Sequence, residues 1–219
     1  MPSALTPMVG REAHVERLND LLTSNGVRLV SIVGLGGMGK TRLALAAGQR
    51  LVDARLFSHG VFFVELATAS RPEQIVNAIA EGIGLALQAG DRRAPKAQLV
   101  DYLAAKEMAL LLDNFEHLVE SADLLAELLQ MAPRVKILVT SRERLRLPGE
   151  QVFPILGLDQ GDADRGSAAQ ASAAVQLFVQ SAQRAAPGFD LSEQNSAQAV
   201  EICRLVEGCR WPSNWRLPG

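Results

Sequence analysis

The residues best suited to chemistry lie in one glycine-rich segment near the start of the chain. Residues 34–41 read GLGGMGKT and match G-x-x-x-x-G-K-[ST], the pattern of a phosphate-binding P-loop. Its glycines let backbone N–H groups turn inward around phosphate oxygens, and the positive end of a following helix adds to the attraction. The segment predicts a site for a nucleoside triphosphate. The expected binding residues are Gly34, Gly36, Gly37, Met38, Gly39, Lys40, Thr41 and Arg42.

Within that segment, two side chains have distinct expected roles. Lys40 is suited to contact the β- and γ-phosphates, and the hydroxyl of Thr41 can ligate Mg²⁺. A P-loop also needs an acidic magnesium anchor at the end of a buried strand, and residues 109–113, ALLLD, supply Asp113. Burying a carboxylate is costly unless a cation faces it. The alternative is that Asp113 caps the segment after it; beside a P-loop, we favour the metal role.

Hydrolysis would need a group that positions water, and two residues after Asp113 are candidates. Asn114 has a polar side chain but cannot act as a base, and Glu116 follows two residues later. Glu116 is equally compatible with a solvated acid in the first turn of a helix, where it would favour the helix dipole. We therefore expect slow, Mg²⁺-dependent ATP hydrolysis at most.

Arg142 is a further candidate, in the segment VTSR at residues 139–142. The carboxyl ends of neighbouring parallel strands face one crevice, so Arg142 would lie on the side of the P-loop. An arginine there could contact the γ-phosphate and distinguish the bound nucleotides. The alternative is a surface arginine in the charged run 142–144.

The elements that must position these residues alternate between strand-like and helix-like patterns. Apolar, β-branched runs predict strands at 28–33, 61–65, 109–112, 136–140 and 151–155. Apolar spacing and helix formers predict helices at 12–23, 40–55, 72–80, 97–105 and 121–130. Strands that are apolar on both faces and separated by helices predict an α/β fold, with a parallel sheet covered on both sides.

The segment 157–171, GLDQGDADRGSAAQA, has the composition of a linker. We expect a nucleotide-binding domain at 1–157, a linker at 158–171 and the start of a helical subdomain at 172–208. Two helices, at 174–185 and 196–207, would form that subdomain.

Composition excludes several classes of protein. The 219 residues are 48% hydrophobic and 21% charged, with a formal net charge of −2, so the basic footprint of a nucleic-acid module is absent. Cys203 and Cys209 do not make a disulfide framework. The sequence shows neither a signal peptide nor an apolar run of about 20 residues. We expect a cytoplasmic protein without membrane contact, and no DNA contact by this segment.

Five ordered motifs, with the P-loop second, resemble those of the NB-ARC domain of STAND-class signal-transduction ATPases, including large bacterial ATP-binding transcription regulators. The motifs are MVGRE (8–12), GLGGMGKT, ALLLDNFEH (109–117), ILVTSRERL (137–145) and VFPILGL (152–158). The resemblance implies a five-stranded parallel sheet in the order 5-1-4-3-2. It also implies a switch that is closed with ADP and opens to homo-oligomerise with ATP.

The same resemblance implies roles for individual residues. Val9 and Arg11 would lie against the adenine, Lys40 and Thr41 would hold the phosphates and Mg²⁺, and Arg142 would be a sensor. Many members have a second acid directly after the magnesium-binding aspartate, where this chain has Asn114. That departure also favours slow hydrolysis.

The last eleven residues, CRWPSNWRLPG, do not fit the family pattern, which continues with a helical Gly-Leu-Pro-Leu-Ala box. One base inserted after the Gly208 codon permits Leu-Pro-Leu-Ala-Ile-Glu-Leu-Ala-Ala-Ala in the shifted frame. We therefore expect 209–219 to be an out-of-frame tail that replaces the remainder of a longer protein. A genuine short protein with an aromatic tail is the alternative.

The sequence is compatible with other functions as well. A small-molecule phosphotransferase on the same loop would need a lid with arginines, for which Arg92 and Arg93 are the only indication. A regulator that binds DNA directly is a third possibility, and a non-functional truncated remnant is a fourth.

Overall fold

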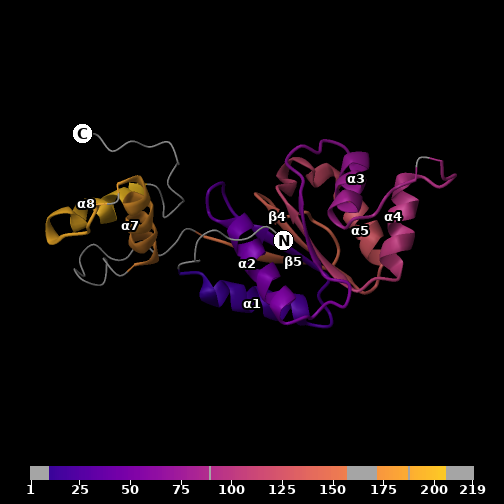
Figure 1. The fold of residues 1–219 in the computed structure, drawn as a ribbon, viewed down its shortest axis with the longest axis horizontal. Helices are drawn as coiled ribbons and strands as arrows, with labels where there is room; N and C mark the ends of the chain where they lie inside the picture. The colour runs from indigo at the N-terminus through magenta and orange to yellow at the C-terminus, as the bar shows by residue number, and fades with distance from the viewer. Residues whose placement is uncertain (1–9, 89, 157–171, 187, 206–219) are drawn as a thin grey trace.

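A five-stranded parallel sheet forms the centre of the region between residues 10 and 156 (Figure 1). The structure is a computed structural model, and it describes residues 10–88, 90–156, 172–186 and 188–205. The strands are β1 (Leu29–Val33), β2 (Val61–Glu65), β3 (Met108–Asp113), β4 (Val135–Ser141) and β5 (Glu150–Pro154). They lie in the order β2-β3-β4-β1-β5, with every adjacent pair parallel. This is the expected order 5-1-4-3-2 read from the other edge, so the predicted fold class is confirmed.

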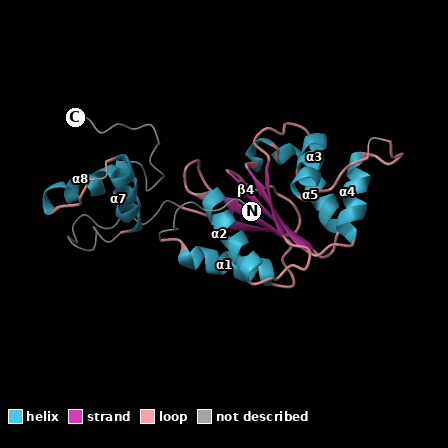
Figure 2. Cartoon of the chain, in the orientation of Figure 1, coloured by secondary structure: helices cyan, strands magenta, loops and turns pink. Residues whose placement is uncertain are grey.

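Helices cover both faces of the sheet, as the apolar strands require (Figure 2). Two helices pack on one face: α1 (Glu12–Thr23) and α2 (Lys40–Asp53). Three pack on the other: α3 (Pro72–Gly82), α4 (Pro95–Ala104) and α5 (Asp123–Met131). Both α3 and α4 begin with proline in the first turn, where its missing N–H costs no hydrogen bond.

Strand β3, which lies between β2 and β4, contributes alternate side chains to the two halves of the core. Leu110 and Leu112 pack with α3, α4 and α5, while Ala109 and Leu111 pack with α1 and α2. All six residues of β3 are buried, including Asp113. Burial of each leucine side chain contributes about 1.5–3 kcal/mol relative to exposure, so this strand is firmly held and its last residue is fixed in space.

Sequence and structure differ mainly at element ends. The helix expected at 121–130 begins at Asp123, because two short 3₁₀ turns, η1 (Phe115–His117) and η2 (Val119–Ser121), come first. Helix α2 stops at Asp53, because Arg55 adopts a left-handed φ of 51° that a helix cannot continue through.

Two further helices, α7 (Ala173–Ala185) and α8 (Glu193–Leu205), pack on each other around a separate apolar cluster that includes Val175, Phe178 and Val200. Ser172 caps α7 through its hydroxyl, which accepts a hydrogen bond from the Val175 N–H at 3.3 Å. The expected linker 158–171, the tail 209–219 and Val9 lie outside the described residues.

Candidate functional site

The P-loop connects the end of β1 to the first turn of α2. Gly37 and Gly39 have φ values of 79° and 84°, in the left-handed region that glycine adopts without steric cost. Gly39 is the residue directly before α2, so the turn delivers the chain to the positive end of that helix. At Gly34 a methyl group would lie 2.6 Å from both the carbonyl oxygen and Cγ2 of Ile155, so this position has no space for a side chain.

Lys40 folds back over the loop that precedes it. Its Nζ donates hydrogen bonds to the carbonyl oxygens of Gly34 and Leu35 at 2.8 and 2.9 Å. Burial lowers the pKa of the Lys40 ammonium; Glu116 and Asp113 act to raise the pKa, and Arg142 acts to lower it further. Lys40 thus lies within electrostatic reach of two carboxylates and a guanidinium, which come from the end of β3, from η1 and from the residue after β4.

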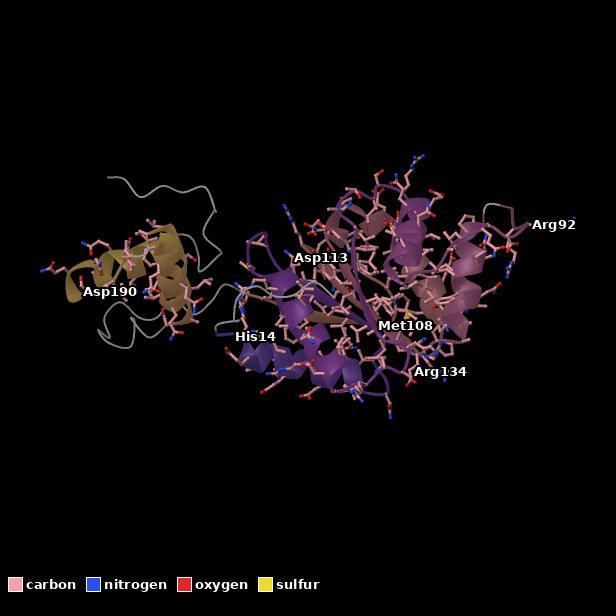
Figure 3. All side chains as sticks on the ribbon, in the orientation of Figure 1. His14, Arg92, Met108, Asp113, Arg134 and Asp190 are labelled. Atoms are coloured by element: carbon pink, nitrogen blue, oxygen red, sulfur yellow. The ribbon has the colours of Figure 1, made fainter. Side chains whose placement is uncertain are left out.

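Asp113 is buried at the end of β3, and its carboxylate accepts hydrogen bonds from two hydroxyl groups. Thr41 Oγ1 donates to Asp113 Oδ1 at 2.8 Å and lies 3.1 Å from Oδ2. Thr140 Oγ1, at the end of β4, donates to Oδ1 at 2.5 Å. Asp113 is only 4% exposed, so these bonds offset part of the cost of its desolvation. Figure 3 shows Asp113 and Met108 at opposite ends of β3.

The residues after Asp113 turn sharply toward β4. Asn114 has φ 62° and ψ 49°, a left-handed conformation that asparagine tolerates better than most residues. Its N–H donates to Thr140 Oγ1 at 3.1 Å. The turn leads directly into η1, whose Phe115 is fully buried. Asn114 therefore forms the turn of the backbone between Asp113 and Glu116.

Glu116 and Arg142 form an ion pair at the mouth of the loop. Arg142 Nε donates to Glu116 Oε1 at 3.0 Å. Arg142 also lies over the P-loop, since a methyl group at Gly36 would contact its Nη2 at 3.8 Å. The expected position of Arg142 beside the P-loop is thus found in the structure.

Arg11 lies before α1 and is buried, with 6% of its surface exposed. Its Nη2 donates to the carbonyl oxygen of Leu156, and Nη1 lies 3.4 Å from His14 Nε2. Burial lowers the pKa of its guanidinium. Arg11 therefore ties the start of the described chain to the segment after β5.

The family described as an AAA domain matches residues 24–145, more than half of the chain. This range contains β1 to β4, the P-loop, Asp113 and Arg142. The chain belongs to the AAA domain family. An AAA domain is a P-loop ATPase domain, which agrees with the fold and with the residues gathered around Lys40.

A relative of this AAA domain is the Mycobacterium tuberculosis protein Rv0890c, provisionally named as an HTH-type transcriptional regulator. It is 35% identical over 189 residues, which are 86% of this chain and 19% of the relative. The chain thus spans about a fifth of the length of that relative.

Two solved structures resemble the fold of the AAA domain. The ORC2 protein of Aeropyrum pernix, in ADPNP and ADP complexes, has a TM-score of 0.53 and 17% identity, and the match covers 87% of this chain and 67% of that one. A STAND protein with a tetratricopeptide repeat sensor, PH0952 of Pyrococcus horikoshii, has a TM-score of 0.51 and 13% identity. That match covers 94% of this chain and 29% of the other.

Most of the residues that the sequence suggested for the site lie close together in the structure. Lys40, Thr41, Asp113, Glu116 and Arg142 all lie around the P-loop of the AAA domain. Met38 packs partly buried against the α1–α2 core, and Arg42 lies in the first turn of α2. The role of Thr140 was missed, although it precedes Arg142 by two residues. The position of a threonine near the end of β4, the strand beside β3, could have indicated its contact with Asp113.

The arginines that suggested a phosphotransferase lid have other surroundings. Arg93 donates to the carboxylates of Asp91 and Asp101, and Nη2–Oδ2 of Asp91 is 2.6 Å. The hydrogen bonds that Asp91 accepts from the side chain and from the backbone N–H of Arg93 lower the pKa of Asp91 to about 2. Arg92 lies at the edge of the AAA domain, away from Asp113 (Figure 3). Arg93 is thus bound to its own loop and to α4.

A cavity of about 490 Å³ lies among α3, α4, η2 and α5, between residues such as Val76, Leu124 and Glu127. None of the expected phosphate-binding residues lines it. Within the part of the AAA domain that is described, no helix combines the length and apolar character needed to cross a bilayer.

Proposed function

We propose that this AAA domain is the ATP- and ADP-binding part of a STAND-type signal-transduction switch. The observation that carries the proposal is the position of Arg142, which lies against Gly36 of the P-loop and is tied to Glu116. An arginine in that place contacts a terminal phosphate if one is present, and it loses that contact when the phosphate is absent. Two nucleotides with different contacts can shift a two-state protein.

The residues present fit Mg²⁺. Thr41 and Asp113 offer a hydroxyl and a carboxylate oxygen 2.8 Å apart, and both are hard oxygen ligands of the kind Mg²⁺ takes in P-loop sites. Mg²⁺ usually keeps several waters and phosphate oxygens as its other ligands, so two protein groups are sufficient. The bound ion would neutralise charge on the β- and γ-phosphates.

The surroundings of Asn114 and Glu116 support slow hydrolysis. Asn114 carries no titratable group, and one oxygen of Glu116 is engaged by Arg142. The carboxylate of Asp113 accepts hydrogen bonds from the hydroxyl groups of Thr41 and Thr140. A water-activating base must direct a carboxylate oxygen at the attacking water, and the hydrogen bond from Arg142 to one oxygen of Glu116 restricts how that carboxylate can turn. A domain that binds ATP and converts it slowly is suited to signalling.

The relationship to a longer regulator is also part of this proposal. A relative provisionally named as a transcriptional regulator is about five times as long as the matched region, which leaves room there for sensor and effector domains. We expect the same organisation, with homo-oligomerisation in the ATP state and a cytoplasmic location. Adenine contact by Val9 and Arg11, and the absence of DNA contact by this segment, remain predictions of the same proposal.

The test is binding of a fluorescent ATP analogue with Mg²⁺ to the wild-type chain and to Lys40→Ala. We expect Lys40→Ala to lose binding, because Lys40 is the phosphate-contacting cation of the loop. Lys96→Ala, at an exposed lysine of α4 that pairs with Glu127, is the matched control and should bind as the wild type does. Undiminished binding by Lys40→Ala would refute the assignment of the site.

A further inference from the structure

Glu116 occupies an unusual electrostatic position at the P-loop. Its Oε1 accepts from Arg142 Nε at 3.0 Å. Its charge is also the strongest influence that raises the pKa of Lys40, ahead of that of Asp113. Glu116 is therefore ion-paired with one of the two cations expected to receive the terminal phosphate, and its charge acts on the other.

The second oxygen of Glu116 is buried without a hydrogen-bond partner among the described residues. An unsatisfied buried carboxylate oxygen costs free energy, so such a group needs a reason to stay where it is. Attraction to Lys40 and Arg142 supplies that reason.

The chain fixes Glu116 from both sides. The preceding residue, Phe115, is fully buried in the α3–α5 core. The following residue, His117, donates from Nε2 to the carbonyl oxygen of Ala69 at 2.6 Å. The Glu116 side chain is 23% exposed, whereas that of Arg142 is 64% exposed. Arg142 is thus the more exposed member of the pair, and Glu116 is the member whose neighbours in the chain are held in place.

We propose that Glu116 determines the preference between ADP and ATP, by acting as a built-in anion that competes with the γ-phosphate for Arg142 and Lys40. This inference rests on the proposed function. ADP leaves the Glu116–Arg142 pair intact, whereas ATP must draw Arg142 away from the carboxylate and bring a second anion beside it. Like charges at close range repel, so Glu116 weakens binding of the triphosphate relative to the diphosphate.

The experiment compares the affinities of ADP and a non-hydrolysable ATP analogue, both with Mg²⁺, by calorimetric titration of the whole 219-residue chain. Glu116→Gln keeps the shape and removes the charge. We expect its preference for the ATP analogue over ADP to rise roughly three- to tenfold above that of the wild type. Glu143→Gln removes an exposed carboxylate that pairs with Arg146 at 4.0 Å, and it should leave the preference unchanged.

A second measurement repeats Glu116→Gln in an Arg142→Gln background, where the gain should shrink because the contested cation is gone. Equal changes in both affinities, or an unchanged preference in Glu116→Gln, would overturn the competition and leave the binding function intact. If the preference of Glu116→Gln is unchanged and a separate assay with ATP shows that hydrolysis is lost, Glu116 is a water-positioning base instead. A wild-type chain that binds neither nucleotide would overturn the proposed function itself.

Discussion

Thr140, near the end of β4, contacts the end of β3, where the candidate magnesium ligand Asp113 lies. Its hydroxyl donates to Asp113 Oδ1 at 2.5 Å and accepts the N–H of Asn114 at 3.1 Å. One hydroxyl thus fixes the carboxylate of Asp113 and the turn that follows it. Because Thr41 binds the same carboxylate from α2, the relative positions of β3, β4 and the P-loop depend on these contacts.

Thr140→Val should therefore affect both stability and magnesium binding. The variant keeps the shape but leaves Asp113 and the Asn114 N–H each short of a partner, at a cost of about 1–3 kcal/mol. Loss of a group that orients a metal ligand weakens metal affinity by roughly 10- to 100-fold. Urea unfolding and Mg²⁺ titration in the presence of ATP measure the two effects. Thr140→Ser retains the hydroxyl and should stay close to wild type; equal loss in both variants would contradict the role given to it.

Gly34→Ala should damage the P-loop through a steric clash. The new methyl group would lie 2.6 Å from the carbonyl oxygen of Ile155, so β5 or the loop must shift, at a cost of about 1–3 kcal/mol. We expect a lower melting temperature and weaker nucleotide binding. Gly26→Ala is the control, since nothing lies within 4 Å of its added methyl group. If the Gly34→Ala variant has wild-type stability and binding, Ile155 can move aside at little cost and the expected clash does not occur.

Substitutions of Asn114 test the importance of the left-handed turn between Asp113 and Glu116. Asn114→Ala places a less tolerant residue at φ 62° and should cost about 1 kcal/mol, whereas Asn114→Gly relieves the backbone and should be close to neutral. Thermal unfolding of the two variants gives the comparison. If alanine were as stable as glycine here, the conformation of this turn would not be under steric control.

His14 should make stability depend on pH. Burial lowers its pKa below the ordinary 6.5, and the charges of Arg11 and Arg17 lower it further. Since the folded state holds His14 neutral, this contribution is fully present above pH 6.5 and is lost as the pH falls through the lowered value. Urea midpoints at pH 7.5 and 5.5 for the wild type and His14→Gln measure it. We expect the variant to lose less stability on acidification; parallel losses would exclude His14 as the source.

The fold class could be predicted from the sequence alone, and the sheet order followed from a family resemblance. The phosphate-binding residues stay a prediction of the P-loop motif. The P-loop is local: its glycines, Lys40 and Thr41 are adjacent in the chain, and a strand before and a helix after them are visible as patterns. The apolar run before Asp113 likewise showed a buried strand with an acid at its end.

The contacts between the strand ends became visible only in the folded protein. Whether Glu116 faces solvent or the P-loop depends on the left-handed Asn114 and on the burial of Phe115, and neither is readable from composition or spacing. Thr140 meets Asp113 because β3 and β4 are neighbours in parallel register, although 27 residues separate the two in sequence. Long-range contacts of this kind follow from chain packing, which no local pattern specifies.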